Sequence, residues 1–80
     1  MDETLAQILE ANRAAASAHS GPLPLPPARR LAVVTCMDAR IDPLGALGLQ
    51  RGDAHVIRVA GARAGEDVLS SLAVSAKVGT

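Results

Sequence analysis

The sequence predicts an α/β fold with a parallel sheet, and three observations lead to this prediction. The continuous apolar run 31–35 has the composition of a strand that is buried on both faces, and 54–59 is typical of a second strand at an exposed edge of the sheet. Helical patterns precede, separate and follow these runs. The last helical pattern, 66–77, would lead into a further strand, yet the sequence ends at Thr80. Two strands do not complete such a sheet, so we expect the fold to be incomplete in this chain.

The chain begins with an expected amphipathic helix. Between residues 2 and 17, Leu5, Ile8 and Leu9 share one helical face among residues that favour helix. Residues 20–27 follow, and their prolines remove backbone donors and fix φ. We expect this proline-rich segment to be an extended strap between the helix and the sheet.

The first strand and a short helix come next. Leu31 to Thr35 is the first apolar run, and Cys36 stands at its carboxyl end. Asp42 followed by Pro43 is typical of an N-cap with proline in the first helical position. A short helix is therefore expected from Pro43 to about Leu47.

The second strand, 54–59, leads through a glycine-containing loop into the last helix. Glu66 and Asp67 suit the first turn of that helix, and Gly79 suits its end. Its spacing predicts an apolar face made of five residues: Val68, Leu69, Leu72, Ala73 and Ala76.

Composition excludes several function classes. Eight basic and eight acidic side chains give a net charge of zero, and the sequence has no Phe, Tyr or Trp. We therefore expect no nucleic-acid partner, because neither a basic field nor a stacking platform is present. The start is acidic rather than basic, and no apolar run is long enough to span a bilayer, so we expect a cytoplasmic protein without membrane contact.

The residues most able to carry chemistry follow the first strand. Cys36, Asp38 and Arg40 alternate, so an extended backbone would point their side chains to one side. An arginine can hold a carboxylate bidentately and keep it ionised, and a thiolate is a good zinc ligand. The alternative is structural, with Cys36 as a small buried hydrophobe and Asp38 with Arg40 as a surface ion pair.

Three segments resemble one enzyme family. Cys36-Met37-Asp38-Ala39-Arg40-Ile41-Asp42 resembles the C-x-D-x-R segment of β-class carbonic anhydrases. Residues 52–58 resemble the second strand of that family, and residues 71–80 resemble the helix that follows it. The resemblance implies the amino-terminal part of a β-carbonic-anhydrase-like three-layer fold. Residues 1–30 would be an amino-terminal helix and strap, and residues 31–80 a partial zinc-enzyme domain.

The resemblance also implies an activity, a cofactor and site residues. Members of the family interconvert carbon dioxide and bicarbonate with Zn²⁺, and many are homodimers or higher oligomers. By resemblance, Cys36 is a zinc ligand. Asp38 either pairs with Arg40 and orients the zinc-bound hydroxide or becomes a fourth ligand, and Arg40 holds Asp38 away from the metal.

The sequence departs from the family pattern at several places, among them Ala62-Arg63-Ala64, where the family commonly has a glycine-rich continuation. The H-x-x-C segment that supplies the remaining zinc ligands does not occur in these 80 residues, so we expect the chain alone to bind zinc weakly and to be inactive. Neither His19 nor His55 is expected to replace those ligands. Val59 stands where the family usually has asparagine, beside the expected pocket.

Three other interpretations remain open. Cys36 could be an enzyme nucleophile whose pKa is lowered by Arg40, although no base is evident. The loop from Gly61 to Gly65 could hold a phosphate, although its glycine spacing matches no phosphate-binding motif. The chain could also be a non-catalytic fragment whose first helix lies on a partner subunit.

Overall fold

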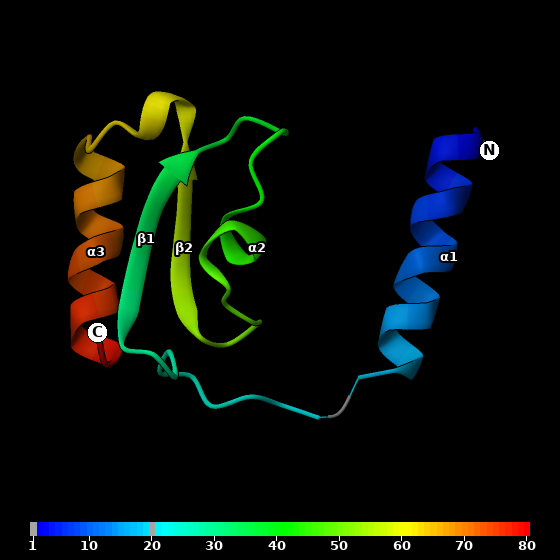
Figure 1. The fold of residues 1–80 in the computed structure, drawn as a ribbon, viewed down its shortest axis with the longest axis horizontal. Coiled ribbons are helices and arrows are strands. Elements are labelled where there is room, and N and C mark those ends of the chain that lie inside the picture. Colours follow the sequence, from blue (N-terminus) through cyan, green and yellow to red (C-terminus); the bar gives the residue numbers. More distant parts are fainter. Residues whose placement is uncertain (1, 20) are drawn as a thin grey trace.

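The computed structural model describes residues 2–19 and 21–80 and contains the expected α/β order. The elements along the chain are α1 (Glu3–Ser17), β1 (Leu31–Cys36), α2 (Pro43–Leu47), β2 (Ala54–Val59), the 3₁₀ turn η1 (Ala60–Ala62) and α3 (Glu66–Val78). β1 and β2 pair in parallel, from Leu31 beside Ala54 to Cys36 beside Val59. α3 lies along one face of this pair and α2 along the other (Figure 1). The predicted parallel α/β arrangement is confirmed.

Local signals position the helix ends. The Asp2 carboxylate accepts a hydrogen bond from the Leu5 amide at 2.8 Å and so begins α1. The Asp42 carboxylate accepts one from the Gly45 amide at 3.1 Å, and Pro43 follows in the first turn of α2. Gly48 ends α2 with φ of 68°, a left-handed conformation in which glycine is unstrained.

Helix α1 stands apart from the rest of the chain (Figure 1). The radius of gyration is 15.0 Å, whereas a compact chain of this length has about 12 Å. Leu5, Ile8 and Leu9 on α1 are 45%, 57% and 49% exposed. The apolar stripe expected from the sequence is therefore present and uncovered.

The core is thin and lies between α3 and the sheet. Val68 and Ser75, both on α3, are each only 3% exposed. The predicted apolar face of α3 is wrong for Leu69, which is 56% exposed, and for the exposed alanines at 73 and 76. Apolar residues surround much of this helix, so the side that packs is set by the sheet and not by helical spacing alone.

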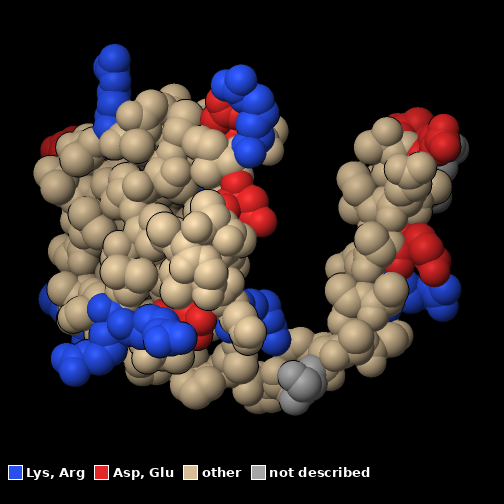
Figure 2. All heavy atoms as spheres, in the orientation of Figure 1, with Lys and Arg blue, Asp and Glu red and all other residues tan. Residues whose placement is uncertain are grey.

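The surface agrees with the zero net charge. On the visible face, acidic and basic side chains lie in mixed groups, and uncharged atoms cover most of the remaining area (Figure 2). Among residues 2–19 and 21–80, no helix has both the length and the apolar character needed to cross a bilayer.

Candidate active site

The candidate site lies at the carboxyl ends of the two strands. Cys36 is the last residue of β1, and its Sγ accepts a hydrogen bond from the Gly61 backbone amide at 3.3 Å. Gly61 follows β2 inside η1 and has φ of 68° and ψ of 10°. This left-handed conformation suits glycine because it has no Cβ. The turn after β2 thus directs an amide proton at the only thiol of the chain.

The surroundings of Cys36 favour the thiolate. The Gly61 amide is the main cause of a lowered Cys36 thiol pKa, and the Asp38 backbone amide lowers this pKa further. Partial burial and the Asp38 carboxylate act in the opposite direction. The interpretation of Cys36 as a nucleophile assigned this lowering to Arg40, but the structure provides it through backbone amides.

Asp38 and Arg40 form a close pair through a turn. The extended backbone predicted for residues 36–40 is wrong, because β1 ends at Cys36 and the chain turns at positions 39 and 40. The Arg40 backbone amide donates to Asp38 Oδ1 at 2.9 Å. The Arg40 guanidinium donates to the same carboxylate from Nε at 3.0 Å and from Nη2 at 2.7 Å. A short side chain-to-backbone turn therefore replaces the expected alternation and still brings the two charges together.

The pair keeps the carboxylate ionised. The Arg40 guanidinium is the main cause of the lowered Asp38 pKa, with the Arg40 amide and the charge of Arg58 adding to it. In return, Asp38 raises the pKa of Arg40. The Arg40 side chain is 89% exposed and that of Asp38 is 29% exposed. Because exposed ion pairs add little stability, we interpret this one as orienting Asp38 rather than supporting the fold.

Sequence reasoning overlooked two contributors to the site. The sequence places Gly61 in a possible phosphate loop, whereas in the structure its amide contacts Cys36. The sequence places Arg58 in a strand, whereas in the structure it donates to carbonyl groups at the end of β1 and in the segment that follows. The available signals were a glycine two residues after β2, at the end of the sheet that carries Cys36, and a charged residue near the end of a mainly apolar strand.

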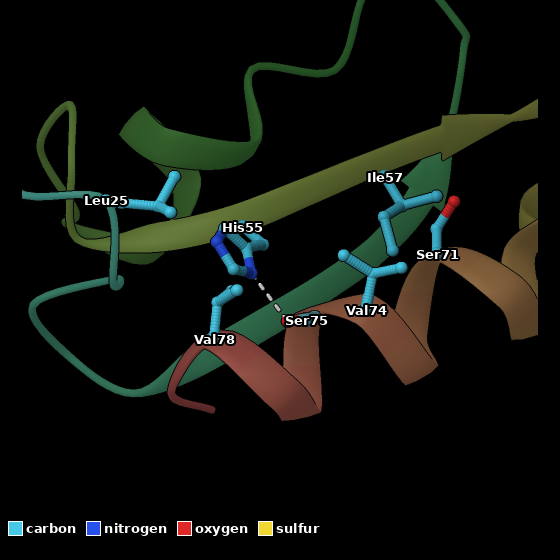
Figure 3. A pocket seen from close by; sticks show the side chains of 7 residues that line it. All are labelled: Leu25, His55, Ile57, Ser71, Val74, Ser75 and Val78. Carbon is cyan, nitrogen blue, oxygen red and sulfur yellow. Dashed lines mark hydrogen bonds between the residues drawn. The ribbon is translucent and has the colours of Figure 1, made fainter.

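His55 lies away from this cluster, near the start of β2, whereas Cys36 lies beside Val59 at the end of β2. His55 Nδ1 is 2.5 Å from Ser75 Oγ, and Ser75 Oγ is 3.0 Å from Thr80 Oγ1. His55 is therefore held by a hydrogen bond to a serine side chain. Figure 3 shows this contact in a pocket of about 450 Å³ between β2 and α3. The pocket is lined by Leu25, His55, Ile57, Ser71, Val74, Ser75 and Val78. None of these lining residues belongs to the cluster of Cys36, Asp38 and Arg40.

The metal donors of the described chain are too few for a closed zinc site. Within residues 2–19 and 21–80, no group of three or more His, Cys, Asp or Glu side chains is arranged to hold a metal ion. Cys36 fits one zinc position as a thiolate donor, and Asp38 is held by Arg40. Catalytic zinc sites use three protein donors, so these residues account for only part of such a site.

Two backbone amides of the loop at residues 61–65 donate hydrogen bonds to acceptors within the chain. The Gly61 amide donates to Cys36 Sγ, and the Gly65 amide donates to the Arg63 carbonyl at 3.0 Å. Both amides already have acceptors, which weakens the phosphate-binding interpretation of this loop.

Comparisons with known sequences point to one family. No family profile matches the sequence. β-Carbonic anhydrase 1 from Mycobacterium tuberculosis is 51% identical over 63 residues, which are 79% of this chain and 39% of that protein. A carbon disulfide hydrolase from Acidianus is 41% identical over 51 residues, which are 64% of this chain and 25% of that protein. The chain thus spans well under half the length of these curated relatives.

Solved structures agree with the sequence comparisons. The carbonic anhydrase from Streptococcus mutans is similar over 100% of this chain and 49% of its own, with a TM-score of 0.88 and 41% identity. The carbonic anhydrase from Glaciozyma antarctica is similar over 89% of this chain and 43% of its own, with a TM-score of 0.80 and 54% identity. On sequence and on fold, the chain belongs to the β-carbonic anhydrase family and spans less than half the length of its relatives.

Proposed function

We propose that these residues supply part of a site for the reversible hydration of carbon dioxide to bicarbonate. One observation carries the proposal: a thiol that receives a backbone hydrogen bond lies next to a bidentate Asp38–Arg40 pair at the strand ends. The β-carbonic anhydrase relatives support the choice of reaction. The carbon disulfide hydrolase aligns over a shorter segment and at lower identity, so carbon dioxide is the favoured substrate.

Each residue has a distinct part in the proposed site. Cys36 would hold Zn²⁺ as a thiolate, a form that the Gly61 amide favours. When bound, zinc lowers the pKa of its water to near 7, which makes hydroxide available at neutral pH. Asp38 stays ionised beside Arg40. Its Oδ2 accepts only from Arg40 Nη2 and so keeps a further lone pair that can accept a hydrogen bond, whereas Oδ1 already accepts two. Arg40 fixes the plane of that carboxylate through two donors.

A chimera provides the test of this function. It joins residues 1–80 to the remaining part of the Streptococcus mutans enzyme, which shares 41% identity with this chain. We expect the chimera to hydrate carbon dioxide in a stopped-flow indicator assay, and the 80-residue chain alone to match buffer. Its Cys36→Ser variant should lose the activity.

Two results would contradict the proposal. One is full hydration activity in the Cys36→Ser chimera, since that thiolate would then be dispensable. The other is a chimera that hydrolyses carbon disulfide but does not hydrate carbon dioxide. An Arg51→Gln chimera is the matched control, because Arg51 is exposed in the turn before β2.

The uncovered stripe on α1 favours a second role as a subunit contact. Leu5, Ile8 and Leu9 are exposed on a helix that stands apart from the rest of the chain. A second copy of the chain is the proposed partner, because apolar side chains of this size gain stability when covered. Wild-type chimera should elute as a dimer or larger assembly, and Leu5→Gln with Ile8→Gln should shift it towards monomer. An assembly unchanged by both substitutions would exclude α1 from the contact.

A further inference from the structure

Arg58 reaches from β2 to the segment that follows β1. It lies beside Thr35 in the parallel pair, one residue before the register ends. Its Nε donates to the Cys36 carbonyl at 3.0 Å. Its Nη2 donates to the Asp38 carbonyl at 2.7 Å and to the Ile41 carbonyl at 3.2 Å. One guanidinium therefore contacts the backbone at the start, the middle and the end of residues 36–41.

The guanidinium suits these contacts for a geometric reason. Its planar fork has donors in fixed directions, so Nε and Nη2 can serve neighbouring acceptors at once. A charged donor also makes stronger hydrogen bonds than a neutral one. Two backbone bonds hold the same segment, from the Met37 amide to the Val59 carbonyl at 3.2 Å and from the Ile41 amide to the Asp38 carbonyl at 3.1 Å. Arg58 adds three bonds to these two.

The segment that Arg58 holds carries the site. Cys36 stands at its start, and the turn at Asp38 and Arg40 lies within it. The Asp38 carbonyl is bound to Arg58 while the Asp38 carboxylate is bound to Arg40. Fixing that carbonyl limits rotation of the Asp38 backbone, and so limits where its carboxylate points.

We infer that Arg58 is the positioning residue of the site: through the carbonyls of Cys36, Asp38 and Ile41 it fixes the turn that orients the Asp38–Arg40 pair. Arg58 acts through other residues and need not contact substrate. Its relevance to catalysis rests on the proposed function, but its effect on the turn does not.

Hydrogen exchange measured by NMR on the ¹⁵N-labelled 80-residue chain tests this inference without metal or substrate. Exchange of the Arg40 amide measures how firmly the Asp38 carboxylate is held, because this amide donates to Asp38 Oδ1. Exchange of the Ile41 amide measures how stable the turn is, because this amide donates to the Asp38 carbonyl. In Arg58→Gln, exchange at both amides should accelerate about tenfold or more, the factor expected when a charged hydrogen bond is lost. The amides of Val33 and Ile57, which by the alternation of the parallel ladder bond across the two strands, should keep their rates.

Two further variants sharpen the result. Arg58→Lys keeps the charge but not the fork, so it should restore only part of the protection. Arg51→Gln, the matched control, should change nothing. The Arg40 Nε–H signal should broaden in Arg58→Gln, because its acceptor, Asp38 Oδ1, loses its fixed position.

Three outcomes would overturn the inference. Unchanged exchange at Arg40 and Ile41 in Arg58→Gln would show that Arg58 does not fix the turn. Equal acceleration at the amides of Val33 and Ile57 would show that Arg58 has a general structural role and does not act on the turn alone. Full protection in Arg58→Lys would show that the guanidinium fork is not needed. Failure of the hydration assay would refute the proposed function and leave these exchange results standing.

Discussion

Replacing Gly61 with alanine should raise the pKa of the Cys36 thiol, because it disturbs the amide that donates to Sγ. An added Cβ would meet only the Arg63 side chain, at 3.8 Å and 3.9 Å, so no steric clash opposes the substitution. The cost comes from the backbone, since φ of 68° disfavours alanine by about 1–2 kcal/mol. Ala62 already has φ of 55°, so two adjacent residues would share this strain.

Relaxation of Gly61→Ala to negative φ would turn its amide away from Cys36. That amide is the first cause of the lowered thiol pKa, so the pKa should move back towards its ordinary value. The direction of the stability change follows from linkage. A thiol with a lowered folded-state pKa adds stability above its unfolded-state pKa and loses it as pH falls through the folded-state value. As pH rises from the folded-state to the unfolded-state pKa of the thiol, the free energy of unfolding should therefore increase less in Gly61→Ala than in wild type.

Thiolate absorbance against pH is a clean assay here, because the chain has one cysteine and no aromatic residue to absorb in the same region. Gly65→Ala is the matched control, since Gly65 has φ of −77° and open space around its Cβ position. The control should keep the wild-type thiol pKa. A Gly61→Ala pKa equal to that of wild type, or equal shifts in both variants, would refute the reasoning.

Two other substitutions test the site and the core. Asp38→Asn should lower the pKa of Cys36 further, because the Asp38 charge opposes the thiolate. The same absorbance titration measures the Cys36 pKa in this variant. Asp67→Asn in α3 is the control and should leave that pKa unchanged. A higher Cys36 pKa in Asp38→Asn would contradict the prediction. Val68→Ala should lower the free energy of unfolding by about 1.5 kcal/mol, since two methyl carbons leave a buried position at about 0.8 kcal/mol each. Thermal unfolding followed by circular dichroism measures this. Val74→Ala, at a residue 62% exposed, should stay within about 0.5 kcal/mol of wild type, and an equal loss would show that Val68 is not the core.

The elements of the fold were predictable because their signals are local. The Asp42–Pro43 start of α2 and the Gly79 end of α3 depend on neighbouring residues only, and both occur as expected. The first strand follows from a continuous apolar run. The packing side of α3 was not predictable, because Leu69 and Val68 are equally apolar and only the sheet distinguishes them.

The chemistry of the site was predictable in part. Residue types indicated that Asp38 and Arg40 pair, and they do. Their spacing suggested an extended backbone, but the Asp38 carboxylate accepts the Arg40 amide and so favours a turn. The contacts of Gly61 with Cys36 and of Arg58 with the segment after β1 join residues more than 15 positions apart, so local spacing could not identify their partners.

The zinc content of the chimera and of its Cys36→Ser variant tests the central claim most directly. We predict about one zinc per chain in the chimera, a large loss in Cys36→Ser, and less than stoichiometric zinc in the 80-residue chain, which supplies one firm donor. Full zinc in the Cys36→Ser chimera would contradict the assignment of Cys36. Stoichiometric zinc in the 80-residue chain would show that other donors, such as His19, His55 or a second chain, complete the site.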